Sequence, residues 1–207
     1  MELVSTTKPL SANKHPEKAQ VPRWLIASKV LLAALLITGA LFPHVGGFEG
    51  KGMLFRLPIF LAPSLIIPIR YWRGKSYLTV LDVGLTLPFL LDTAANAFGI
   101  YDSFNRTDDV LHFVNWFILF GAITATIAAS ESGRRTPMWI ACIAGTGIGA
   151  MGAIGWEVAE YMAMQSGVGH LSLTYRDTLS DLVLSTAGGG VGSYIALRFA
   201  TRKQRNV

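Results

Sequence analysis

Long apolar segments separated by short polar ones make up the chain from residue 24 onward. Each segment is close to or longer than the roughly 20 residues that an α-helix needs to cross a bilayer. The second segment contains prolines, which kink a membrane-spanning helix without preventing it from spanning. The pattern predicts an all-α, multi-pass transmembrane bundle with six spans. We expect these spans at Trp24–Phe42, Met53–Ile69, Tyr77–Ile100, Asp108–Ala129, Pro137–Met164 and Asp177–Phe199.

The polar ends divide the chain into three parts. We expect residues 1–23 to form a disordered cytoplasmic tail, residues 24–200 the six-span domain, and residues 201–207 a basic cytoplasmic tail. The first span could be a signal peptide cleaved near Ala40, but its long basic lead-in favours an uncleaved span. Lys29 lies near the start of this span and is expected to extend its ammonium group to the lipid headgroups.

The distribution of basic residues predicts the orientation in the membrane. Most lysines and arginines outside the spans lie on the side that holds both termini, whereas the opposite side has Lys51, Arg106 and Arg176. Cytoplasmic loops carry the excess of positive charge in membrane proteins. We therefore expect both termini in the cytoplasm and the protein in the plasma (inner) membrane.

The amino-acid composition excludes several other classes of protein. Of 207 residues, 51% are apolar and 15% are charged, too few charges for an ordinary soluble domain. The single cysteine, Cys142, rules out an intrachain disulfide and a cysteine metal cluster. The net charge of +5 comes from residues at the ends of apolar segments, so it does not predict nucleic-acid binding. Membrane lipids are the expected partners, and a homo-oligomer is compatible with this composition.

Ionisable residues at one end of the bundle are the candidate site. Asp108, His112 and Asn115 recur at i, i+4 and i+7, so they share one helical face. The fifth and sixth spans repeat the pattern with paired acids, and the predicted orientation brings all three motifs to the outer end. These acids are Glu157, Glu160, Asp177 and Asp181.

Clustered carboxylates in a low-dielectric setting need protons, a basic residue or a metal ion to compensate their charge. A histidine with several carboxylates suits zinc, manganese or iron, whose bound water supplies a hydroxide nucleophile. The candidate catalytic residues are Asp108, His112, Glu157, Glu160, Asp177 and Asp181. The candidate ligands of a divalent metal ion are His112, Glu157, Glu160 and Asp181.

Three functions fit this set of residues. The first is metal-dependent binding or hydrolysis of a lipid-linked or phosphate-bearing envelope substrate, with Arg176, Asn96 and Asp92 as substrate-binding residues and His170 at the rim. The second is a proton- or cation-coupled transporter, with Asp82 and Asp92 as relay groups. The third is a structural membrane subunit, in which the acids form hydrogen bonds between helices.

The three motifs together resemble a known family. They are Asp108-x-x-x-His112-Phe113, Glu157-x-x-Glu160-Tyr161 and Asp177-Thr178-x-x-Asp181, the last followed by Gly188. This set resembles the YjdF-like inner-membrane family of unknown function and, more distantly, the VanZ-like family. Asp109, Glu160 and Ser185 stand where VanZ-like proteins carry Lys, Gln and Asn. The resemblance implies a multi-pass membrane protein and no particular substrate.

Glycines in the last two spans are expected to let helices approach closely. These residues are Gly145, Gly149, Gly152, Gly188 and Gly192.

Overall fold

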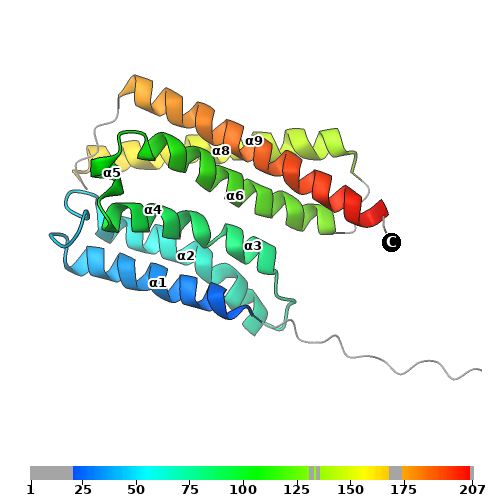
Figure 1. Ribbon diagram of the computed structural model, residues 1–207, viewed down its shortest axis with the longest axis horizontal. Coiled ribbons are helices and arrows are strands. Elements are labelled where there is room, and N and C mark those ends of the chain that lie inside the picture. The colour runs from blue at the N-terminus through cyan, green and yellow to red at the C-terminus, as the bar shows by residue number, and fades with distance from the viewer. Residues whose placement is uncertain (1–20, 131–132, 134–135, 168–173, 206–207) are drawn as a thin grey trace, which may run out of the picture.

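The computed structural model describes residues 21–130, 133, 136–167 and 174–205, and within these ranges it contains helices and no strand (Figure 1). The tail predicted over residues 1–23 falls almost wholly outside the described residues, as does His170. The helices are α1 (Arg23–Leu41), α2 (Met53–Trp72), α3 (Thr79–Gly84), α4 (Leu87–Ala97), α5 (Ile100–Ser103), α6 (Thr107–Ala129), α8 (Met138–Gln165) and α9 (Tyr175–Arg205). The predicted all-α class is confirmed.

Five helical stretches in the described part of the chain are long and apolar enough to cross a membrane. They are α1, α2, α3 with α4, α6 and α8. The helix at the expected sixth span, α9, is 31 residues long but does not belong to this group. It begins with Asp177 and Asp181, carries several glycines and ends in basic residues, so it is less apolar than the others.

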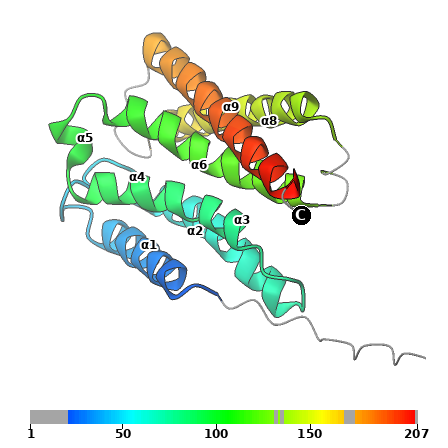
Figure 2. The same cartoon turned by 45° about the vertical axis from the view of Figure 1, so that its right-hand side comes forward.

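The helices run roughly along the long axis of the molecule (Figure 1). Helix α1 packs against α2 and α4, α4 packs against α6, and α6 packs against α9, which also contacts α8. Helix α4 therefore joins the first pair of helices to the last three. The start of α1 and the end of α9 lie at the same end of the bundle (Figures 1 and 2).

The predicted third span, Tyr77–Ile100, is not one continuous helix. It is divided into α3, α4 and the short α5, with a break at Leu85 and Thr86. Pro88 has no N–H to donate to the carbonyl of Gly84 four residues earlier, and its ring crowds that carbonyl, so the helix is interrupted there. The break leaves the Thr86 hydroxyl free to bond outside its own helix.

Helices α6 and α9 approach closely along a row of small residues. A Cβ atom added to Gly188 would lie 2.2 Å from the Phe113 carbonyl oxygen, and one added to Gly192 would lie 2.3 Å from that of Phe117. Farther along, the hydroxyls of Thr124 and Ser193 lie 2.9 Å apart. The close-packing prediction is confirmed for both α9 glycines.

The close-packing prediction also covered three glycines of α8. A Cβ atom at Gly145 would lie 2.6 Å from Ser193 Oγ, and one at Gly152 would lie 2.8 Å from the Trp116 ring, so both lie at close contacts. At Gly149 the nearest atom is 3.6 Å away, an ordinary contact distance.

The prediction that Lys29 extends to the headgroups is wrong. Its ammonium group donates to Asp82 Oδ1 at 2.7 Å, to Thr86 Oγ1 at 3.0 Å and to the Ser64 carbonyl oxygen. That carbonyl lacks a helical donor because residue 68 is a proline. All three acceptor residues are fully buried, so the ammonium compensates a buried carboxylate that would otherwise have no counter-charge there among the described residues.

Candidate functional site

A cavity of about 680 Å³ lies between α2, α4, α6 and α8 and reaches the loops at the end of the bundle where α1 ends and α2 begins. Its lining includes Asp108, His112 and Asn115, so the face predicted from their spacing points into it. Of the other predicted site residues, Asp92, Asn96, Glu160 and Asp177 also line the cavity. Glu157 and Asp181 are buried, with 7% and 2% of their surfaces exposed.

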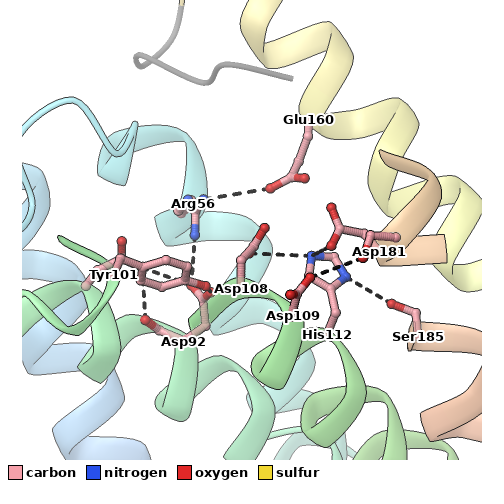
Figure 3. Close-up of polar contacts among 11 residues, drawn as sticks. Arg56, Asp92, Tyr101, Asp108, Asp109, His112, Glu160, Asp181 and Ser185 are labelled. Atoms are coloured by element: carbon pink, nitrogen blue, oxygen red, sulfur yellow. Dashed lines mark hydrogen bonds and ion pairs between the residues drawn. The ribbon is translucent and has the colours of Figure 1, made fainter. Parts of the chain in front are cut away.

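His112 on α6 faces carboxylates from two helices (Figure 3). Its Nε2 lies 3.7 Å from Asp108 Oδ1 and 3.8 Å from Asp181 Oδ1 of α9. Its Nδ1 lies 2.9 Å from the Ser185 hydroxyl, which fixes the plane of the ring. Ser185 is fully buried, and a serine hydroxyl can accept an N–H from the ring, leaving the Nε2 lone pair directed at the acids.

Two acids of α8 also lie close to His112. Ligand atoms of His112, Glu157 and Glu160 lie within 4.8 Å of one another, and the same holds for Asp108, His112 and Asp181. His112 belongs to both groups. Glu157 Oε2 is buried and has no hydrogen-bond partner among the described residues. The motifs predicted to meet at one end of the bundle therefore do so, and either group could hold a metal ion.

A largely buried arginine on α2, Arg56, lines the cavity and points toward acids of α4 and α8 (Figure 3). Its Nη1 donates to Asp92 Oδ2 of α4 at 2.8 Å, and its Nη2 lies 3.8 Å from Glu160 Oε1 of α8. The second distance is too long for a hydrogen bond, so the Nη2 donors are not fully used. Arg56 therefore links the two halves of the bundle and places a positive charge beside the acids.

Asp92 is held by three donors. Besides Arg56, the Tyr101 hydroxyl donates to its Oδ1 at 2.6 Å and Asn96 Nδ2 lies 3.3 Å from its Oδ2. Burial and the neighbouring Asp92 carboxylate raise the pKa of the Tyr101 phenol, so it stays a hydrogen-bond donor. These bonds occupy Asp92 and Asn96, the two residues predicted to bind substrate, and they orient Arg56.

Arg176, the third residue predicted to bind substrate, is placed differently. It is exposed in the first turn of α9, and the ion pairs among the described residues do not include it. Its neighbour Asp177 lines the cavity, and the Asp177 N–H donates to the Thr174 hydroxyl at 3.2 Å. Arg56 is the basic residue that the cluster contains.

Sequence reasoning did not assign Arg56 or Tyr101 to the site. A signal for Arg56 exists, because a charged residue inside an apolar segment usually faces the interior of a bundle and pairs there. Tyr101 carries no comparable signal. Its role depends on the turn between α4 and α5, where Gly99 has a left-handed backbone with φ of 66°.

Asp82 lies apart from this site. It bonds to Lys29, and its Oδ2 accepts a hydrogen bond from the Tyr77 hydroxyl. It is thus a buried residue near the end of the bundle at which α1 begins, where it joins α3 to α1.

The fold and the site define an integral-membrane helical bundle with a buried acidic and histidine cluster. The family model described as predicted membrane protein (DUF2238) matches residues 24–202, and the chain belongs to this family. It is the YjdF-like family that the motifs resemble, so that resemblance is confirmed. No curated protein and no solved structure matches the chain.

Proposed function

We propose that the cluster binds a divalent metal ion and hydrolyses a phosphate-bearing or lipid-linked envelope substrate. The observation that carries the proposal is the position of His112 Nε2, 3.7 Å from Asp108 and 3.8 Å from Asp181. These distances are too long for hydrogen bonds. They match two ligand atoms that each bind a zinc-type ion at about 2.0–2.2 Å, which leaves such atoms about 3–4 Å apart.

Charge balance supports a cation at this position. The cluster contains the carboxyl groups of Asp108, Glu157, Glu160 and Asp181, whereas Arg56 is already paired with Asp92. Several carboxylates cannot all stay ionised in a buried site without compensation. A divalent ion held by His112 and some of these acids supplies that compensation.

The second ring nitrogen of His112 supports the same reading. A metal-binding histidine usually donates its other N–H to a fixed acceptor, which sets the tautomer and the ring orientation. The Ser185 hydroxyl is such an acceptor for Nδ1, at 2.9 Å. A bound metal ion would supply a Lewis acid and a water molecule that ionises near neutral pH. Glu157, whose buried Oε2 has no hydrogen-bond partner in the part of the chain that the structure describes, is the residue we assign to accept the proton from that water.

Arg56 replaces Arg176 as the proposed anion-binding residue. Its Nη2 is within reach of Glu160 but not hydrogen-bonded to it, so a phosphate oxygen could take up this donor. Lys51 also lines the cavity, with its ammonium group 3.2 Å from Asp102. A phosphate placed between the metal position and Arg56 would be bound from two sides.

The transporter alternative is less well supported. Both acids of the proposed relay are tied to buried basic residues, Asp82 to Lys29 at 2.7 Å and Asp92 to Arg56 at 2.8 Å. A group that carries protons or cations along a path must release them, and an ion pair of this kind opposes protonation of the carboxylate.

We propose that the protein lies in the plasma membrane with six spans, of which α9 is the sixth. Both termini are then in the cytoplasm. Supporting this topology, α1 begins and α9 ends at one end of the bundle, and positive charge is concentrated there. The site then faces the outer side.

Metal analysis tests the proposed function. Detergent-purified wild type, His112→Ala and His44→Ala should be compared by elemental analysis and by calorimetric titration with Zn²⁺ and Mn²⁺. His44 is a matched control because its side chain is 84% exposed. We expect a stoichiometric ion in wild type and His44→Ala and its loss in His112→Ala, with chelator-sensitive phosphoester hydrolysis. Absence of bound metal from the wild type would overturn the proposal.

A further inference from the structure

The cavity has a polar end and an apolar end. Arg56, His112 and the acids lie at the polar end, whereas the deeper wall contains Phe60, Phe89, Trp116 and Trp156. The ring centres of Phe60 and Phe89 are 5.0 Å apart, and those of Phe60 and Trp156 are 5.6 Å apart. Helices α2, α4 and α8 thus form a continuous aromatic wall that suits a hydrocarbon chain better than an ion.

One residue of the cavity wall, Gly155, lies beside the exposed apolar face of α8. Gly155 of α8 lines the cavity and is also exposed, and a Cβ atom added there would meet no atom of the described residues within 4 Å. At Gly152, one turn away, an added Cβ would lie 2.8 Å from the Trp116 ring. Of these two cavity-lining glycines, Gly155 is the one with open space beside it.

The surroundings of this opening are apolar. The neighbouring side chains Met151, Ile154 and Val158 are exposed on α8, as expected for a helix that faces lipid. Gly155 lies ten residues before the last residue of α8, Gln165, which corresponds to roughly 15 Å along a helix axis. At that depth a side opening meets hydrocarbon chains rather than water.

We propose that the cavity takes a phosphate-headed membrane lipid sideways from the bilayer, with its hydrocarbon chain passing α8 at Gly155. This inference rests on the proposed function for the placing of the phosphate, and it narrows the substrate class from phosphate-bearing or lipid-linked compounds to a phosphate-headed membrane lipid that enters from the bilayer. The Nη2 donors of Arg56 and the metal position receive the head. The aromatic wall and Gly155 receive the first part of the chain.

Two tryptophans in the cavity wall provide a direct test. The chain has five tryptophans, and the three outside the cavity, Trp24, Trp72 and Trp139, are exposed by 51%, 88% and 66%. Replacing these three by Phe leaves Trp116 and Trp156 as reporters. Bromine atoms on lipid chains quench tryptophan fluorescence on contact. The protein is reconstituted in phosphatidylcholine vesicles with a small mole fraction of brominated probe.

The probes differ in the head alone. One is a non-hydrolysable phosphonate analogue of phosphatidic acid, and the other is a diacylglycerol with the same brominated chains. Gly155→Leu fills the opening, whereas Gly147→Leu adds the same side chain to α8 at a position that also meets no described atom within 4 Å but does not line the cavity.

We expect the phosphonate lipid to quench more than the diacylglycerol, and we expect Gly155→Leu to abolish this excess while Gly147→Leu retains it. Equal quenching by both probes, or an excess that survives Gly155→Leu, would overturn lateral lipid entry. Calorimetric metal binding by the same variants is recorded separately. Metal binding without excess quenching would overturn lateral lipid entry and leave the metal site standing. Excess quenching without metal binding would overturn the metal site and leave lipid entry standing.

Discussion

At the scale of single residues, the molecule treats its buried charges in two ways. Lys29 with Asp82, and Arg56 with Asp92, are ion pairs between helices at 2.7 and 2.8 Å. Around His112, the described residues place a basic side chain beside Glu160 alone, where Arg56 Nη2 lies 3.8 Å from Oε1, and Glu157 Oε2 lacks a partner among the same residues. Since buried polar atoms are nearly always hydrogen-bonded, an unpaired one indicates a position where a ligand or a proton acts.

Glu157→Gln distinguishes a metal site from interhelical hydrogen bonding. If a divalent ion compensates the cluster, the change removes an anionic group, weakens metal binding by about 10–100-fold and makes the melting temperature insensitive to chelator. If the acids only form hydrogen bonds, glutamine keeps the shape and bonding capacity and should be tolerated. The measurement is the melting temperature of wild type and variant, with and without chelator.

The control for that comparison is Glu49→Gln, because Glu49 is 78% exposed. Its melting temperature should follow the wild type under both conditions. Identical values for all three proteins, with and without chelator, would contradict the metal site and favour the structural reading.

Lys29→Met tests the buried ion pair on its own. Removing the ammonium leaves the Asp82 carboxylate buried without its counter-charge, which typically costs about 3–5 kcal/mol. The exposed Lys75 provides the matched control, Lys75→Met. Adding Asp82→Asn to Lys29→Met should recover much of the loss, because the amide is neutral and still accepts the bond from Tyr77. Failure of the double variant to recover stability in thermal melts would contradict this role.

Residue spacing in the sequence predicts contacts within one helix but not contacts between helices. Asp108 and His112 could be placed on one face because both belong to one helix with a fixed rise and turn. The pairing of Arg56 with Asp92 and Glu160 depends on how three helices are rotated about their axes. No spacing within a single segment contains that information.

At the scale of elements, the seam between α6 and α9 holds the site together. His112 and Ser185 join across it at 2.9 Å, and one turn along, Gly188 lies directly against the Phe113 backbone. The glycines of α9 predicted a close approach to a neighbouring helix, since small residues mark close helix pairs, but they did not predict that this neighbour is α6. The division of the third span was not expected, although Pro88 is the residue that causes it.

Gly188→Ala and Gly189→Ala form a matched pair on adjacent positions of α9. Both replace glycine by the better helix former. At Gly188 the new methyl group would lie 2.2 Å from the Phe113 carbonyl oxygen, whereas at Gly189 its nearest neighbour would be the Phe120 ring at 3.6 Å. We therefore expect Gly188→Ala to lower the melting temperature in detergent and to weaken metal binding. Gly189→Ala should match or exceed the wild type, and equal behaviour of the two would contradict the close seam.

At the scale of the whole molecule, the bundle separates two buried polar regions. The first, which we call the Lys29 cluster, contains Lys29, Asp82 and Thr86 and lies toward the end where α1 begins. The second, the His112 cluster, contains His112 and the surrounding acids and lies toward the other end, near the short α5. The excess of basic residues in the sequence predicted which end faces the cytoplasm, because that signal does not depend on helix packing. The cavity could not be foreseen, since its volume depends on the placement of four helices.

The orientation can be tested with the single natural cysteine removed. In a Cys142→Ser background, Glu49→Cys lies in the loop between α1 and α2, at the end that carries the His112 cluster, and Lys75→Cys lies between α2 and α3 at the other end. Both positions are exposed, so a membrane-impermeant maleimide can reach each one from its own side. We expect Glu49→Cys to be labelled in intact cells and Lys75→Cys only after the membrane is permeabilised. The reverse pattern would place the site on the cytoplasmic side, and a metal ion and substrate would then have to be supplied from the cytoplasm.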